Sequence, residues 1–153
     1  MKNYRILVLS GQNLNVLGKR EVSVYGAKTF EEVYDEVRVL AVELGADVIF
    51  AQDNSEGAMI DIIQDAEGRF DGVIINAGAY THYSYALRDA IGASTLPFIE
   101  THITNIFGRE EFRRVSVIAP ACVGLVAGFG SGSYSLSLRA MVEYLSIRDM
   151  NSS

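Results

Sequence analysis

Short, continuous runs of apolar residues alternate along this chain with longer segments in which apolar residues recur at helical spacing. The short runs have the length of strands and few polar interruptions, a pattern typical of strands buried on both faces of a parallel sheet. They predict five strands, at residues 5–10, 47–52, 71–76, 97–101 and 123–127.

The segments between these runs predict helices. The clearest one begins after Thr29, where Thr29 and Glu32 form a capping box, and it ends at Gly45. A second helix is predicted to begin at residues 54–56, and two more to span about residues 83–93 and 134–147. Residues 103–120 are the least regular part, with one short helix expected near residues 109–114.

A chain of 153 residues is one domain of ordinary size. Strands that alternate with helices predict a three-layer α/β sandwich around a parallel sheet. For five strands the flavodoxin-like order 2-1-3-4-5 is favoured. We expect this single domain to span residues 1–150, followed by a polar tail at residues 151–153 that frays.

The connection between the first strand and the first helix is unusually long. It includes residues 11–26, whereas such connections usually take roughly 2–6 residues. Long connections are mostly lids, binding loops or disordered segments. This one carries Asn13, Arg20 and Tyr25, which together are capable of proton chemistry. The loop alone does not decide between a catalytic lid and an ordinary mobile surface loop.

Composition narrows the partners and the location. A hydrophobic content of 49% and a charged content of 21% describe a soluble globular protein. No apolar run approaches the ~20 residues that cross a bilayer, so no membrane partner is expected. The net charge of −6 argues against nucleic-acid binding, which needs a basic face. The single cysteine, Cys122, is interpreted as a buried apolar residue, and with no signal peptide we expect a cytoplasmic protein.

A cluster of arginines stands out in this acidic chain. Arg109, Arg113 and Arg114 lie within six positions of one another. A small anionic ligand is one interpretation of the cluster. A solvated helix face, paired with Glu110 and Glu111, is the other, and it stays open above all for Arg114.

Polar residues follow the carboxyl ends of the predicted strands, where parallel α/β sheets bind their ligands. They include both histidines of the chain, His82 and His102. The others are Asn13, Gln52, Asp53, Asn54, Asn76, Gly78, Glu100, Thr104 and Asn105. A metal site fits poorly, because two histidines and one cysteine show no ligand spacing, and no phosphate-binding glycine motif follows the first strand. We therefore predict a functional site at this edge.

The same positions carry a resemblance to a known family. From about Arg5 to Leu145, the chain resembles the type II 3-dehydroquinate dehydratases. Four motifs in order carry the resemblance: GQNLNVLG with its following arginine and Tyr-Gly (residues 11–26), NAGAYTH (76–82), PFIETHITN (97–105) and REEFR (109–113).

The resemblance implies a cofactor-free anti-elimination of water from 3-dehydroquinate. The product is 3-dehydroshikimate, formed through an enolate, either in the shikimate pathway or in quinate breakdown. By position, Tyr25 corresponds to the base that removes the C2 proton, and Arg20 to the cation that favours its phenolate. His102 corresponds to the general acid, oriented by Glu100, and Asn13 to the group that stabilises the enolate.

The resemblance also implies binding residues and an assembly. The substrate would be held by Asn76, Gly78, His82, Arg113 and the backbone at Ile103 and Thr104. Members of the family form homo-oligomers, dodecamers built from trimers. In these, the residue at the position of Asp89 reaches a neighbouring subunit's site.

Elementary electrostatics makes a tyrosine base plausible. An ordinary tyrosine has a pKa of about 10, so presenting a phenolate at pH 7 costs roughly 4 kcal/mol. A guanidinium about 4 Å away contributes on the order of 4 kcal/mol at an effective dielectric near 20. One arginine can therefore make a tyrosine a workable base once the loop closes and excludes water.

The chain departs from the family at a few positions. Proline is common in the family at the position of Gln12, and its loss predicts a looser start of the loop. Proline is also usual at the position of Ala77.

Two alternative functions are considered. One is an inactive relative that serves as a structural or regulatory oligomer, against which the complete set of catalytic residue types argues. The other is a flavodoxin-like nucleotide-binding module, for which no motif is present.

Overall fold

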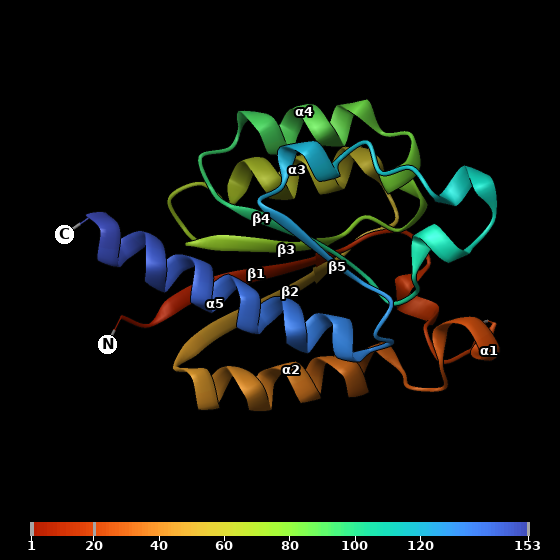
Figure 1. Ribbon diagram of the computed structural model, residues 1–153, viewed down its shortest axis with the longest axis horizontal. Coiled ribbons are helices and arrows are strands. Elements are labelled where there is room, and N and C mark those ends of the chain that lie inside the picture. Colours follow the sequence, from red (N-terminus) through yellow and green to blue (C-terminus); the bar gives the residue numbers. More distant parts are fainter. Residues whose placement is uncertain (1, 20, 153) are drawn as a thin grey trace.

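The computed structural model describes residues 2–19 and 21–152. Within them, five parallel strands form one sheet in the order β2-β1-β3-β4-β5, which confirms the predicted flavodoxin-like topology (Figure 1). The strands are β1 (Tyr4–Ser10), β2 (Ala46–Gln52), β3 (Gly72–Asn76), β4 (Phe98–His102) and β5 (Gly124–Ala127). Each observed strand end lies within one residue of its predicted position, because apolar runs mark buried strands strongly.

The four longest helices cover both faces of the sheet (Figure 1). They are α2 (Phe30–Leu44) and α5 (Gly132–Ser152) on one face, and α3 (Glu56–Asp65) and α4 (Tyr85–Ala93) on the other. The alternation of side chains along β1 divides the core accordingly. Ile6 and Val8 pack in the cluster with α2 and α5, whereas Leu7 and Leu9 pack in the cluster with α3 and α4.

Hydroxyl side chains cap three of these helices. Thr29 accepts a hydrogen bond from the Glu32 N–H at 3.3 Å, as predicted, but the Glu32 carboxylate returns to the Thr29 hydroxyl at 3.1 Å. Ser55 caps α3 through the Ala58 N–H, and Ser84 caps α4 through the Leu87 N–H. The cap at Ser84 explains why α4 begins two residues later than predicted, after a 3-10 turn η2 at Gly78–His82.

The C-terminal helix corrects the expected fraying tail. α5 continues through Ser152 rather than ending near Ile147, so residues 151 and 152 are helical. The phenol of Tyr4 donates to Asp149 at 2.8 Å and ties the last turns to β1, while Ser152 Oγ donates back to the Arg148 carbonyl at 2.9 Å. Ser153 lies outside the described residues.

The irregular regions consist of short helical turns. The short helix expected near residues 109–114 is the 3-10 turn η4 (Glu111–Arg113), which lies between the turns η3 (Ile106–Gly108) and η5 (Ala119–Ala121). The long first loop contains η1 (Leu14–Val16) and the short helix α1 (Val22–Tyr25).

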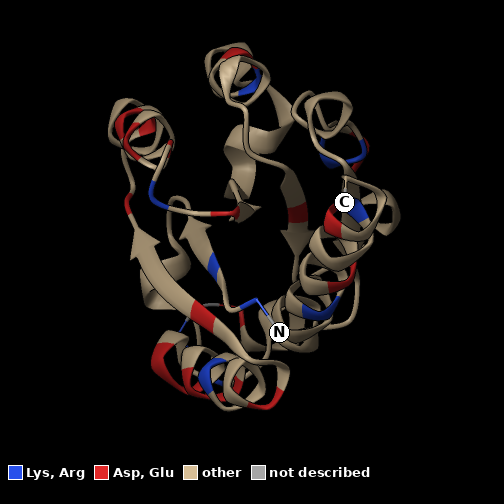
Figure 2. Ribbon diagram, turned by 90° about the vertical axis from the view of Figure 1, so that its left-hand side faces the viewer, with Lys and Arg blue, Asp and Glu red and all other residues tan. Residues whose placement is uncertain are grey.

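The distribution of charge on the surface agrees with the acidic net charge of the chain. Positive and negative positions are interspersed over the helices around the sheet in Figure 2, without an extended basic face in that view. Among the described helices, none combines the length and the apolar composition needed to span a bilayer.

Candidate active site

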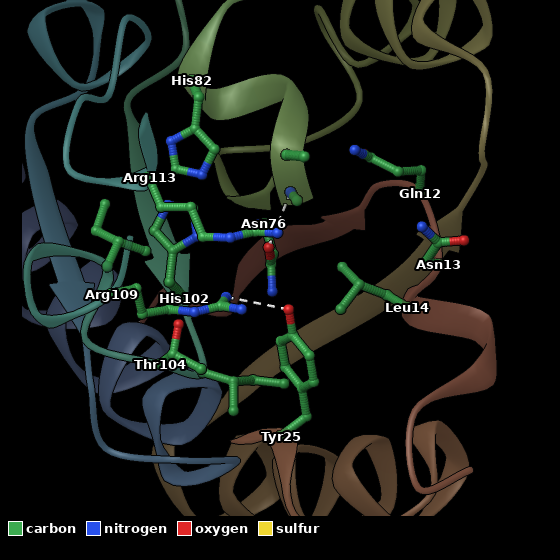
Figure 3. Close-up of a pocket in the computed structure, with 14 residues that line it drawn as sticks. Gln12, Asn13, Leu14, Tyr25, Asn76, His82, His102, Thr104, Arg109 and Arg113 are labelled. Carbon is green, nitrogen blue, oxygen red and sulfur yellow. Dashed lines mark hydrogen bonds between the residues drawn. The ribbon is translucent and has the colours of Figure 1, made fainter. Parts of the chain in front are cut away.

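A pocket opens at the carboxyl edge of the sheet, where the polar strand ends meet (Figure 3). Nine of its lining residues are site residues predicted from the sequence: Asn13, Tyr25, Asn76, Gly78, His82, His102, Ile103, Thr104 and Arg113. Five further residues also line the pocket: Gln12, Leu14, Ala79, Ile106 and Arg109. Of these, only Arg109 was considered as a ligand contact from the sequence, as a member of the arginine cluster. The register explains the convergence, since Ser10 pairs with both Gln52 and Asn76 at the ends of β1, β2 and β3.

Two residues that were given a role, Glu100 and Asp89, are not part of this lining, and a third is not described. Glu100 lies behind it, in contact with His102. Asp89 is exposed on α4 and does not line the pocket of its own chain. Arg20 lies outside the described residues.

A buried carboxylate orients His102. Residues 100 and 102 project to the same side of β4 because side chains alternate along a strand. His102 Nε2 lies 2.5 Å from Glu100 Oε2, and Glu100 is completely buried. The Ser116 hydroxyl donates to Glu100 Oε1 at 2.7 Å, and the Thr81 hydroxyl donates to Oε2 at 3.2 Å. These contacts fix the imidazole plane, and Nδ1 has no hydrogen-bond partner within residues 2–19 and 21–152.

The guanidinium group of Arg109 contacts the phenol of Tyr25. Arg109 Nη1 donates to Tyr25 Oη at 3.0 Å, the contact marked by a dashed line in Figure 3. The Arg109 Cζ atom also lies 5.3 Å from the centre of the Tyr25 ring. A charged donor at this distance stabilises a phenolate more than a phenol. Tyr25 and Arg109 therefore form a candidate proton acceptor and its supporting cation.

His82 is held in a neutral form. Its Nδ1 lies 2.7 Å from the Val115 carbonyl oxygen, which only accepts hydrogen bonds, so Nδ1 carries the proton. Desolvation lowers the pKa of His82 below its ordinary value, and the bond to Val115 opposes this effect only in part. At pH 7 the ring is thus neutral, with Nε2 as an acceptor.

The arginine cluster divides between pocket and surface. Arg109 and Arg113 line the pocket, whereas Arg114 is exposed and donates through Nε to the Arg109 carbonyl at 3.2 Å. Arg113 Nε also contacts the Glu110 carboxylate at 2.5 Å. Two guanidinium groups in one pocket suit an anionic ligand, since arginine binds carboxylates well.

The start of the first loop is fastened on one side by Asn54. Asn13 adopts a left-handed backbone conformation with φ of 68°, which asparagine tolerates better than most residues. The Asn13 N–H donates to Asn54 Oδ1 at 3.0 Å, and Gln52 Nε2 donates to the same oxygen at 3.1 Å. The Tyr80 hydroxyl donates to the Asn54 carbonyl at 2.8 Å. Asn54 thus connects the loop, the end of β2 and the turn η2.

Gln12 fastens the loop on its other side. With the amide nitrogen toward the Ala77 carbonyl and the amide oxygen toward the Ala79 N–H, both hydrogen bonds measure 2.9 Å. The Gly11 N–H extends the same pairing by donating to the Asn76 carbonyl at 2.7 Å. The expected looser start of the loop is therefore offset, because the Gln12 amide pairs with the backbone of η2 as a peptide group would.

Cys122 agrees with its interpretation as a buried residue. It is largely buried beside Glu100, and desolvation raises the pKa of its thiol to about 12. The thiolate that a nucleophile requires is thus disfavoured at neutral pH.

Comparison with known proteins completes the description of the site. Residues 4–142 match the family described as Dehydroquinase class II. The chain is 52% identical to the 3-dehydroquinate dehydratase of Prochlorococcus marinus (strain NATL1A), over 92% of this chain and 97% of that protein. Among solved structures, the type II dehydroquinase from Butyrivibrio crossotus DSM 2876 matches with a TM-score of 0.88 and 42% identity, covering 91% of this chain and 97% of the other. The type II dehydroquinase from Propionibacterium acnes matches with a TM-score of 0.87 and 40% identity, covering 92% and 97%.

Proposed function

Since the chain belongs to the class II dehydroquinase family, we propose from that premise how its pocket removes water from 3-dehydroquinate. The activity is that of a hydro-lyase, as in the relatives named 3-dehydroquinate dehydratase. The observation that carries the mechanism is a base and an acid that border one pocket: Tyr25 held by Arg109, and His102 held by Glu100.

Tyr25 is the base. As a phenolate it takes the proton from C2 of the substrate, and the electron pair left behind forms an enolate with the neighbouring ketone. Arg109 supports the phenolate through the 3.0 Å contact, a role that sequence analysis gave to Arg20. Arg20 remains a proposed second cation on the ground of the sequence motif.

His102 is the general acid. As the enolate returns its electron pair, a double bond forms between C1 and C2 and the bond from C1 to its hydroxyl breaks. The departing oxygen takes a proton from His102 and leaves as water. Glu100 holds the imidazole in place for this step. The phenol of Tyr25 and the neutral imidazole then exchange protons with solvent to reset the site.

The remaining lining residues hold the substrate. Asn13, near the start of the first loop, stabilises the enolate oxygen. The two guanidinium groups supply positive charge near the anionic substrate, with Arg113 in direct contact with its carboxylate. Polar contacts to its hydroxyl groups come from Asn76, Gly78, His82 and the backbone of Ile103 and Thr104.

We also assign the family's assembly to this chain, a homododecamer built from trimers in the cytoplasm. Several large apolar side chains support an assembly because they are exposed on the single chain. Val42 is 82% exposed, Phe129 65% and Phe112 62%. In this assembly Asp89 reaches the pocket of a neighbouring subunit.

An ultraviolet assay tests the proposal, because the product contains a conjugated enone and the substrate does not. The wild-type protein should convert 3-dehydroquinate at a measurable rate, and Tyr25→Phe should lose turnover while still binding substrate. Tyr144→Phe is the matched control, since Tyr144 lies on α5 outside the pocket. Activity of Tyr25→Phe within about tenfold of wild type, equivalent to ~1.4 kcal/mol of barrier, would exclude Tyr25 as the base.

A further inference from the structure

A chain of buried polar groups lies behind the pocket and ends at Asn76. The Tyr34 hydroxyl donates to Ser10 Oγ at 3.3 Å, and Ser10 Oγ lies 3.0 Å from Tyr134 Oη. Asn76 Nδ2 in turn donates to Tyr134 Oη at 3.0 Å. The four groups come from four elements: α2, the strands β1 and β3, and α5.

All four residues are withdrawn from water. Ser10 is 0% exposed, Tyr134 1%, Asn76 3% and Tyr34 4%. Burial in an apolar cluster raises the pKa of Tyr134 to about 12, so its hydroxyl keeps its proton at neutral pH. A polar group buried in an apolar cluster destabilises the folded protein unless it makes a hydrogen bond. The hydrogen bonds of the network therefore hold these four side chains in position. Of the four, only Asn76 lines the pocket.

The Gly78 N–H determines the direction of the hydrogen bond between Asn76 and Tyr134. The Gly78 N–H can only donate, so the Asn76 atom 3.1 Å from it is the amide oxygen. The Asn76 amide nitrogen must then face Tyr134 Oη, which accepts. The hydroxyl groups of Tyr134 and Ser10 share the hydrogen bond between them, and Ser10 Oγ also accepts from Tyr34.

The geometry points to Tyr134 as a positioning residue for substrate binding, acting through Asn76. Its phenol oxygen holds one amide hydrogen of Asn76, and the Gly78 N–H holds the amide oxygen. The second amide hydrogen of Asn76 has no partner within the described residues and is left to an oxygen atom of the ligand. Asn76 thereby selects a hydroxyl or carboxylate oxygen at its place in the pocket. This inference rests on the proposed role of Asn76 in holding the substrate.

The test compares two tyrosines that lose the same hydroxyl group. Tyr134→Phe removes the acceptor of Asn76, whereas Tyr34→Phe removes a buried hydroxyl that lies two hydrogen bonds further from the pocket. Steady-state kinetics with 3-dehydroquinate should show KM raised by about five- to tenfold in Tyr134→Phe, the equivalent of one lost hydrogen bond, with kcat changed less than KM. Tyr34→Phe should leave KM within about twofold of wild type, although thermal unfolding should show both variants destabilised.

A double-mutant cycle with Asn76→Ala separates positioning from a general structural effect. Asn76→Ala alone should raise KM, and adding Tyr134→Phe should raise it no further. Ser10→Ala gives an independent variant, since it keeps Tyr134 but removes the hydroxyl group that contacts its phenol oxygen, and it should also raise KM. The inference would be overturned if the KM increases of Tyr134→Phe and Asn76→Ala multiplied in the double variant, or if the two tyrosine variants had equal KM values. Either result would leave the role of Asn76 intact. An unchanged KM in Asn76→Ala would instead refute the binding role of Asn76, and the inference with it.

Discussion

Arg109 shows how much the charge state of one side chain depends on a residue distant in sequence. It lies 84 positions from Tyr25, yet its guanidinium donates directly to the phenol oxygen. Neither group alone explains a base at neutral pH, because an isolated tyrosine is protonated there. In the proposed mechanism, Arg109 supplies the neighbouring positive charge that a phenolate needs.

Replacement of Arg109 should therefore act on the chemical step. Arg109→Gln removes the charge, and we expect kcat to fall by about 10²–10³-fold, because on the order of 4 kcal/mol of phenolate stabilisation at an effective dielectric near 20 is the upper limit of the loss. Raising the pH from 7 to 9 should restore part of the rate, since phenolate then forms more readily. Arg148→Gln, on the far end of α5, serves as the control. An Arg109→Gln enzyme with wild-type kcat at pH 7 would remove Arg109 from the mechanism.

The two histidines should separate into different kinetic effects. His102→Ala removes the proposed acid, so kcat should fall by about 10²–10⁴-fold. His82→Asn removes a neutral acceptor of the pocket and should raise KM with a smaller change in kcat. The measurement is the full dependence of rate on 3-dehydroquinate concentration for both variants. The opposite pattern, with kcat lost in His82→Asn and retained in His102→Ala, would exchange the two roles.

At the scale of elements, the first loop is attached at its start and carries Tyr25 near its end. Gln12 and Asn54 tie its start to η2 and to the end of β2. Tyr25 lies at the end of α1, beyond the glycine at position 18, whose positive φ of 89° favours a residue without Cβ. The attached start fixes Asn13, while the remaining turns carry the base toward Arg109.

Loss of the Gln12 amide should loosen this attachment. Gln12→Ala removes two hydrogen bonds to the backbone of η2, each contributing about 1 kcal/mol. We expect kcat/KM to fall by about three- to tenfold, with the unfolding midpoint almost unchanged because the sheet and its helices keep their contacts. Gln12→Glu is the matched variant, as it retains the acceptor for the Ala79 N–H but has no donor for Ala77. Equal kcat/KM for wild type and both variants would show that the attachment does not affect catalysis.

At the scale of the whole molecule, a parallel sheet brings residues from the entire chain to one edge. The pocket takes side chains from the loops after β1, β3 and β4, which adjoin one another in the sheet. Asp89 does not reach this pocket within one chain, so a role for it requires a second copy. The exposed apolar side chains give such a copy a surface to bury.

The proposed assembly has a direct test. Sedimentation velocity should give a particle about twelve times the mass of the 16.7 kDa chain. Asp89→Ala and Tyr25→Phe should each be inactive or weak alone. When the two variants are unfolded, mixed and refolded together, activity should return, because some pockets then combine an intact Tyr25 with an intact Asp89 from a neighbour. A monomeric particle, or mixed oligomers without recovered activity, would contradict a shared site.

The sequence by itself determined the fold to within a residue at every strand end. Buried parallel strands must be continuously apolar, as in Ile6–Leu9, and a helix cap such as Thr29 needs only its immediate neighbours. The motifs of the family also placed nine of the lining residues of the pocket in advance. These features are local in sequence, so a one-dimensional pattern can carry them.

Only the tertiary structure decided which groups act on one another. The contact of Arg109 with Tyr25 and the attachment of Gln12 to η2 both depend on how distant segments pack. The same is true of Asn76, whose amide direction is set by Gly78 on one side and by Tyr134 on the other. Electrostatic and hydrogen-bond energies depend on distances of a few ångströms between atoms, and the sequence does not specify those distances until the chain has folded.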